Sequence, residues 1–231
     1  PRLSIGLSIM LSLIVRQGAG VCLSLLKIFK KFTTPRKGLW YHGVYPESGG
    51  VFMTLDEAMR SRHTVRRYTD RKLPGEVLEA LDGRIQKNNR EYGLAMNLVT
   101  ENTEAFGPLL RLFLAKGVRH YVILAGRDRP GLDEAVGYCG ADVMLFAQTL
   151  GLNSWWVGGT FRRKGLQKNA APEAEKILGL LALGYGAVQG VPHKSKRPED
   201  VAAYEGEAPA WFARGTEALL LAPTALNRQA F

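Results

Sequence analysis

The order of strand-like and helix-like segments is the feature that most constrains how this chain can fold. Two amphipathic segments come first, beginning near Thr54 and Pro74. Four runs rich in β-branched, aromatic and aliphatic residues follow, at residues 94–99, 118–126, 154–159 and 177–186. Such runs predict strands. Because helical patterns separate them without a strict βαβ alternation, we expect an α+β fold rather than a doubly wound parallel sheet.

Local signals define the ends of several predicted helices. Thr54 and Glu57 have the spacing of a capping box, in which each residue satisfies the other's backbone N–H. The longest predicted helix covers residues 132–151 and ends at Gly151, a residue type that favours helix termination. A helix starting near Pro74 carries apolar residues at core spacing, namely Val77, Leu78, Leu81 and Ile85. Further helices are predicted at residues 103–116, with a break point at Gly107-Pro108, and at 209–222.

The positive charge of the chain is unevenly distributed. Of the formal net charge of +10, residues 1–52 carry +6, which leaves only +4 for the other 179 residues. Those residues contain no helix-turn-helix, zinc-finger or RNA-binding sheet motif, so we do not expect nucleic acid as a partner. Cys22 and Cys139 have no CxxC partner, which predicts neither a disulfide framework nor a structural zinc site. A reduced, cytoplasmic protein is therefore expected.

Residues 1–52 differ in character from the rest of the chain. Their apolar run at residues 3–15 is interrupted by Arg16, and about 20 apolar residues are needed to span a bilayer. The "RQGAG" sequence is a weak signal-peptide cleavage site. A third interpretation places the native start at Met53. The codons for the Gly-Gly pair shortly before it can have the sequence GGAGGN, which resembles a bacterial ribosome-binding site. We therefore divide the chain into an N-terminal extension, 1–52, and one domain, 53–231.

The heptad "RHTVRRY" at residues 62–68 concentrates positive charge after a short helix. Arg62 and Arg66 can face one point with the Thr64 hydroxyl between them, and guanidinium groups match phosphate oxygens bidentately. A second basic cluster, "HKSKR", lies at residues 193–197. The alternative for each cluster is a solvated basic surface, but together they indicate a mononucleotide-like ligand.

Two glycine-containing segments suggest ligand contacts of different kinds. In "WWVGGT", residues 155–160, the glycines allow backbone N–H groups to approach a planar ligand, although core tryptophans beside a tight turn explain the pattern equally well. In "GYGAVQG", residues 184–190, the spacing departs from G-x-G-x-x-G and no helix follows. A Rossmann site needs that helix, so none is predicted. No hydrolase triad or HExxH sequence is present, which favours chemistry by a bound cofactor.

Several motifs resemble those of the FMN-dependent nitroreductase family. "RHTVRRYTDRKLP" is similar to the family's opening signature, and "LFAQTLGLNSWWVGGT" to its "LGLGTxWxG" segment. "LLALGYG" and "KSK" resemble its "ALGYP" strand and its basic tail, and "LAPTALNRQAF" resembles its "APSAxNxQPW" signature. That signature comes last here, as in the divergent TM nitroreductase group, whose label does not mean transmembrane. Since that group continues further, we expect the chain to be truncated after Phe231.

The resemblance implies a nitroreductase-like α+β fold, with a central and mainly antiparallel sheet flanked by helices. It also implies a flavoprotein that takes a hydride from NADH or NADPH onto FMN and passes electrons to a nitroaromatic, quinone or similar small-molecule acceptor. The family forms homodimers, and the changed motif order would also suit a pseudo-dimeric monomer. The alternatives are a flavin- or nucleotide-binding module without turnover and a basic protein anchored to the membrane by residues 1–37; a membrane is not an expected partner.

The resemblance also carries over an expected set of cofactor-binding residues, with no side chain expected to act as a catalyst and no metal site. The phosphate and ribityl chain of FMN are expected at Arg62, His63, Thr64 and Arg66, with added charge from Lys194 and Lys196. Backbone N–H groups of Gly158 and Gly159 are expected to face the reactive edge of the flavin. The isoalloxazine or ribityl side is expected to contact Pro223, Thr224, Asn227 and Gln229.

Overall fold

A computed structural model describes residues 53–231 of the chain. These residues fall into two compact units, residues 53–194 and residues 195–231. The interpretations of residues 1–52 as extension, signal or anchor lie outside the described residues. Between residues 53 and 231, no helix is both long enough and apolar enough to cross a bilayer.

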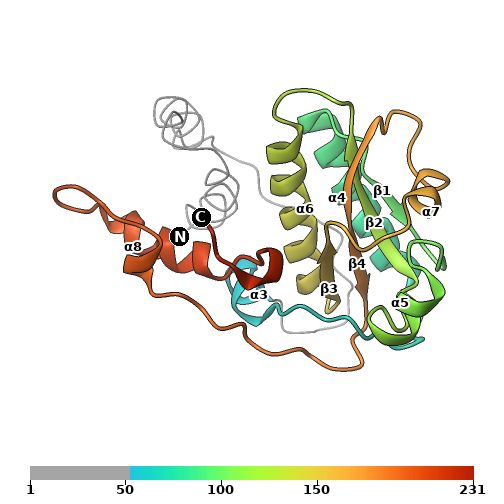
Figure 1. Ribbon diagram of the computed structural model, residues 1–231, viewed down its shortest axis with the longest axis horizontal. Coiled ribbons are helices and arrows are strands. Elements are labelled where there is room, and N and C mark those ends of the chain that lie inside the picture. The colour runs from blue at the N-terminus through green and yellow to red at the C-terminus, as the bar shows by residue number, and fades with distance from the viewer. Residues whose placement is uncertain (1–52) are drawn as a thin grey trace. The chain divides into compact units, whose positions relative to one another are not determined.

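The larger unit is built on a four-stranded sheet in the order β1-β2-β4-β3 (Figure 1). All three strand pairs are antiparallel. The strands are β1 (Asn97–Val99), β2 (His120–Gly126), β3 (Asn153–Val157) and β4 (Lys176–Gly184). The predicted α+β class with a mainly antiparallel sheet is confirmed.

Both faces of this sheet are buried. On β2, Val122 and Leu124 belong to one hydrophobic core, while Tyr121 and Ile123 belong to a second core on the opposite face. The strand β4 alternates in the same way between the two cores. A strand buried on both faces has no polar positions to alternate with, which explains why β2 and β4 read as nearly continuous apolar runs.

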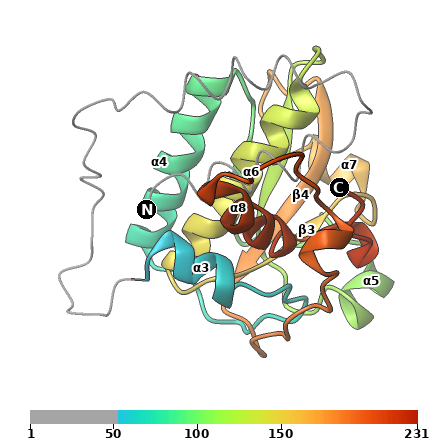
Figure 2. The same ribbon diagram turned by 90° about the vertical axis from the view of Figure 1, so that its left-hand side faces the viewer.

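Two long helices, α4 (Gly75–Tyr92) and α6 (Leu132–Thr149), contribute to the first core. Figure 2 shows them side by side, and a partly buried ion pair between Arg84 of α4 and Asp142 of α6 joins them. The helix α6 ends as its sequence predicts, since Gly151 adopts a φ of 77°. The Leu152 N–H then donates at 3.0 Å to the Ala147 carbonyl, which also accepts the Leu150 N–H at 3.1 Å, so the last turn closes on itself.

The short helix α3 (Leu55–Ser61) begins with the predicted capping box. The Thr54 N–H donates to Glu57 Oε2 at 2.6 Å, and the Glu57 N–H donates to Thr54 Oγ1 at 3.2 Å. This helix contacts α6, and its Ala58 and Met59 are buried. The capping box therefore fixes where the chain enters the basic heptad.

Some predicted element boundaries are wrong. The helix predicted at 103–116 is only α5 (Pro108–Phe113), because Pro108 occupies the first helical turn and Ala105 and Phe106 are buried in the second core instead. The strand predicted at 94–99 is regular only from Asn97. A further helix, α7 (Arg163–Gln167), was not predicted; it has five residues and no side-chain cap, so it leaves little signal in the sequence.

The smaller unit, residues 195–231, contains the predicted helix as α8 (Ala210–Leu220). Short 3₁₀ turns lie on either side of it, η1 (Pro198–Asp200) and η2 (Ala225–Asn227). Arg197 joins η1 through hydrogen bonds from its Nε and Nη2 atoms to the Asp200 carboxylate, at 3.1 and 2.9 Å.

Candidate functional site

The basic heptad follows α3 and is tied to the larger unit at several points. Thr64 forms a parallel bridge with Ser154 at the start of β3, and the Val65 N–H donates to the Ser154 carbonyl at 3.0 Å. The Tyr68 N–H donates to the Lys116 carbonyl at 2.9 Å. These backbone bonds place the heptad against the sheet, so its side chains are presented from a defined position rather than from a free loop.

Arg62 is the buried cation of the heptad. Its residue is only 5% exposed, although it caps the C-terminus of α3. Within residues 53–231 its guanidinium has no carboxylate within ion-pair distance and no side-chain hydrogen bond. Burial alone lowers the pKa of Arg62 to about 10. A buried charge without a counter-charge is costly, so this position is suited to receive an anion.

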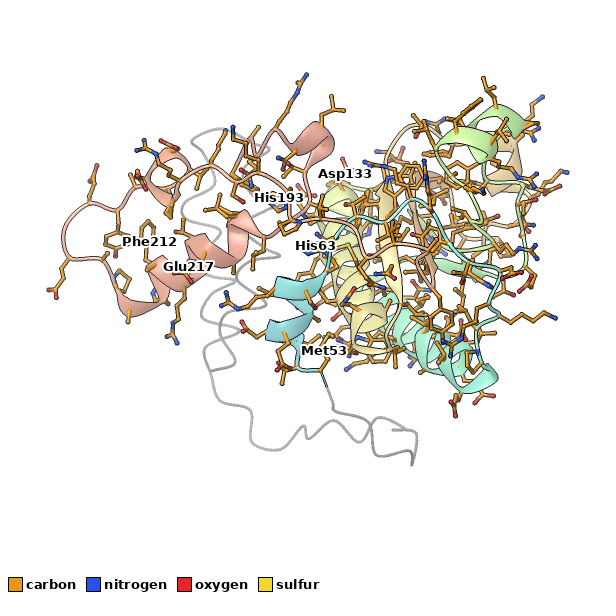
Figure 3. All side chains as sticks on the ribbon, turned by 90° about the horizontal axis from the view of Figure 1, so that it is seen from below. Met53, His63, Asp133, His193, Phe212 and Glu217 are labelled. Carbon is orange, nitrogen blue, oxygen red and sulfur yellow. The ribbon has the colours of Figure 1, made fainter. Side chains whose placement is uncertain are left out.

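His63 lies next to this arginine and interacts with the second basic cluster. Its pKa is lowered first by burial, then by the Arg62 charge and further by His193. Figure 3 labels both histidines and shows them near one another. Gly190 makes this approach tight, because it has a φ of 74° and an added Cβ would lie 2.9 Å from the His63 Cβ. His63 and His193 therefore lie near one another, and the exposed Lys194 follows His193 directly. Convergence of the two clusters on one phosphate stays a prediction.

Arg66 has a different environment from Arg62. It is exposed, and its guanidinium carbon lies 5.4 Å from the centre of the Trp155 ring. Trp155 in turn stacks on Phe106, with ring centres 5.6 Å apart and planes 7° apart. The sequence did not distinguish the two arginines, yet one is buried without a counter-charge and the other covers an aromatic stack.

The segment around β3 distinguishes the two interpretations of "WWVGGT", which are core packing and contact with a planar ligand. Trp155 belongs to the second core, and Trp156 packs so closely on Gly140 that an added Cβ there would lie 2.6 Å from its ring. The core interpretation is thus correct for both tryptophans. Gly158 and Gly159 are different, because both are exposed and an added Cβ at either would meet nothing within 4 Å. Packing does not require glycine at these two positions, which leaves their backbone open to a ligand.

The glycines of "GYGAVQG" have structural neighbours. An added Cβ at Gly184 would lie 2.9 Å from the Tyr68 ring, and one at Gly186 would lie 2.6 Å from the Asn153 Oδ1. That same Asn153 oxygen accepts the Gly186 N–H at 2.9 Å. These glycines bring the basic heptad and β3 close together. Asn153 and Ser154 carry no sequence motif, so their positioning role was not predicted.

In the smaller unit, two of the expected cofactor residues, Lys196 and Thr224, come together around a third, Gln229. The Lys196 N–H and Nζ donate to Gln229 Oε1 and to its carbonyl, at 2.6 and 3.0 Å. The Gln229 N–H donates to Thr224 Oγ1 at 3.0 Å, and its buried Nε2 donates to the Leu220 carbonyl at 3.2 Å. Both ends of the Gln229 amide are thus engaged inside the unit. Pro223 and Asn227 are exposed.

Comparison with known proteins places the chain in a family. It matches the family described as "Putative TM nitroreductase" over residues 54–231. No match was found among curated proteins.

Solved structures share the fold. A putative nitroreductase from Thermotoga maritima has a TM-score of 0.53 and 20% identity, over 83% of this chain and 74% of that one. A putative nitroreductase in complex with FMN from Desulfovibrio desulfuricans has a TM-score of 0.50 and 18% identity, over 67% of this chain and 98% of that one. The enone reductase CLA-ER has a TM-score of 0.53 and 12% identity, over 66% and 98% respectively. The family match covers both units, and the chain therefore belongs to the Putative TM nitroreductase family.

Proposed function

We propose that this chain is a flavin-dependent oxidoreductase that passes a hydride from NADH or NADPH, through FMN, to a nitroaromatic, quinone or similar acceptor. The observation that carries the proposal is the buried Arg62 guanidinium, which has no anionic partner within residues 53–231. A terminal phosphate supplies the missing negative charge, and its oxygens match a guanidinium fork. The family match and an FMN-bound structural relative support the same assignment.

The proposal gives residues of the larger unit separate roles in holding FMN. Arg62 would hold the phosphate, with the Thr64 hydroxyl beside it and His63 and Lys194 adding positive charge. The exposed backbone of Gly158 and Gly159 would face the ring system. Arg66 covers Trp155 and would contribute charge from the rim of the site.

The assignments in the smaller unit rest on the resemblance. Pro223, Thr224 and Asn227 would line the isoalloxazine or ribityl side, and Lys196 would add charge. Gln229 is engaged with Lys196, Thr224 and Leu220, which favours a role in holding these residues rather than in touching the cofactor.

When bound, FMN supplies the hydride chemistry, and the chain binds and orients the reactants. Arg62 and its neighbours would anchor one end of the cofactor through charge, and the glycine turn would leave space over the other. Orienting two planar rings in contact is one contribution that such a site would make to the rate. Direct hydride transfer needs no acid or base from a side chain, and the protons that the reduced acceptor takes up can come from solvent.

Anaerobic reduction distinguishes this proposal from a flavin-binding module without turnover. We expect the visible absorbance of flavin bound to the full chain to bleach when NADH or NADPH is added. Recovery of the flavin absorbance on adding air or a quinone would support turnover. Retained flavin that neither nucleotide reduces would instead identify a binding module.

The affinity for FMN is expected to rise as the pH falls from 8 to about 6.5. In the free protein, burial and Arg62 hold the pKa of His63 below its usual value, so His63 is neutral at pH 7. A bound phosphate dianion would raise that pKa, so binding would take up a proton and strengthen as the pH falls through the pKa of the complex. Fluorescence titration at several pH values measures this dependence. His63→Asn is the control. If the FMN affinity of this variant depends on pH as strongly as that of the unmodified protein, His63 does not belong to the site.

A further inference from the structure

The helix α5 (Pro108–Phe113) carries apolar side chains that point into solvent. Leu109, Leu112 and Phe113 are 72%, 67% and 64% exposed, and no residue of α5 is buried. Their spacing of three and four residues places them on one helical face. Only Leu110 packs against the second core, as a partly buried residue. We call Leu109, Leu112 and Phe113 the α5 stripe.

The fold gives no reason for this stripe to be apolar. Leu114 is also exposed, so Leu112, Phe113 and Leu114 form a run of three consecutive exposed apolar residues. Such runs are disfavoured on the surface of a soluble protein unless they contact a partner. The stripe is therefore a candidate contact surface.

Basic residues lie close to the stripe in the sequence and on the adjoining helix. Arg111 and Lys116 are exposed and form no ion pair within the described part of the chain, whereas the nearby Glu101 and Glu104 pair with Arg119 and Lys168. More positive charge comes from the start of α7, at Arg162, Arg163 and Lys164.

The start of α7 adjoins the start of α5. The Arg162 N–H donates to the Ala105 carbonyl at 2.8 Å, and the Arg162 Cδ lies 3.8 Å from where a Gly107 Cβ would stand. The partner of the stripe must therefore accept apolar side chains while carrying negative charge nearby.

A second copy of the chain fits this requirement poorly. A two-fold interface places the same patch on both sides, so the positive charges beside it at the start of α7 would come close to their own copies. An anionic lipid surface fits both properties, because leucine and phenylalanine side chains enter the interfacial region while arginine and lysine meet the headgroups. We propose that α5 docks this protein on the surface of anionic membranes. The contact is peripheral and does not depend on bound flavin.

Vesicle sedimentation tests this directly on the full chain. We expect the protein to pellet with vesicles of phosphatidylcholine and phosphatidylglycerol and not with phosphatidylcholine alone. The double variant Leu112→Gln and Phe113→Gln should lower the partition coefficient about 10-fold or more, since two apolar side chains leave the interface. The variant Arg111→Gln with Lys116→Gln should weaken binding about 10-fold or more and reduce its salt dependence.

The matched control is Val188→Gln with Val191→Gln, which replaces two exposed apolar residues outside α5. Circular dichroism checks that each variant stays folded, which is expected because the replaced side chains are exposed. Binding that survives the α5 substitutions, or that the control abolishes equally, overturns the proposal. Absence of binding by the unmodified chain also overturns it, and self-association that the α5 substitutions abolish would assign the stripe to a second copy.

Discussion

Replacing Arg62 with methionine is expected to lower the affinity for FMN about 10- to 150-fold and to leave the protein folded. Hydrogen bonds to a charged group contribute about 1.5–3 kcal/mol, and their loss weakens binding by the corresponding factor. The effect should be smaller for riboflavin, which has the same ring system without the phosphate. Fluorescence titration with both flavins separates a phosphate contact from a general disturbance of the site.

The same substitution should raise the free energy of unfolding of the flavin-free protein. Arg62 is buried without a counter-charge in the described residues, and methionine fills a similar volume without the desolvation cost. Arg60→Met is the matched control, because Arg60 lies in α3 only two residues earlier and forms an exposed ion pair with Asp56. An unchanged FMN affinity in Arg62→Met would remove this residue from the site. A lower stability would mean that the guanidinium already has a partner in the native protein.

Replacing Asp142 with alanine is expected to lower the free energy of unfolding by about 3 kcal/mol, because it removes the counter-charge of the partly buried Arg84. Asp142 Oδ2 accepts hydrogen bonds from Arg84 Nε at 2.6 Å and from Asn88 Nδ2 at 2.9 Å. The Arg84 and Asp142 side chains are only 10% and 18% exposed. Urea unfolding measures the loss.

Asp56→Ala provides the comparison for this second prediction. Its ion pair with Arg60 has an N–O distance of 3.0 Å, but the two side chains are 61% and 51% exposed. Exposed pairs contribute at most about 1 kcal/mol, so Asp56→Ala should cost far less than Asp142→Ala. An equal loss in free energy of unfolding in the two variants would show that the ion pair between Arg84 and Asp142 stabilises the fold no more than an exposed pair does.

The parts of the fold that depend on neighbouring residues could be predicted from the sequence. The capping box at Thr54, the stop at Gly151 and the apolar runs of β2 and β4 act over a few residues, and the structure has all of them. The helix predicted at 103–116 was too long because burial of Ala105 and Phe106 in the second core outweighs their helical pattern. The pair of Arg84 and Asp142 joins residues 58 positions apart, so no local pattern reveals it.

The candidate site divides in the same way. Sequence alone predicted that positive charge gathers at residues 62–68 and approaches His193. It could not separate the buried Arg62 from the exposed Arg66, whose guanidinium lies over Trp155, because burial and such contacts depend on residues that are distant in the sequence. It also could not assign Gln229, whose hydrogen bonds to Lys196, Thr224 and Leu220 form only once the smaller unit has folded.

The most direct test of the proposed function is a titration of the full chain with FMN, followed by gel filtration and a visible spectrum of the protein fraction. The account predicts that FMN binds saturably, elutes with the protein and is released unchanged on denaturation. This result is expected if the FMN phosphate pairs with the buried Arg62 guanidinium. FMN that elutes entirely apart from a correctly folded protein, as judged by circular dichroism, would contradict the flavin site and with it the assignment of this chain as an oxidoreductase.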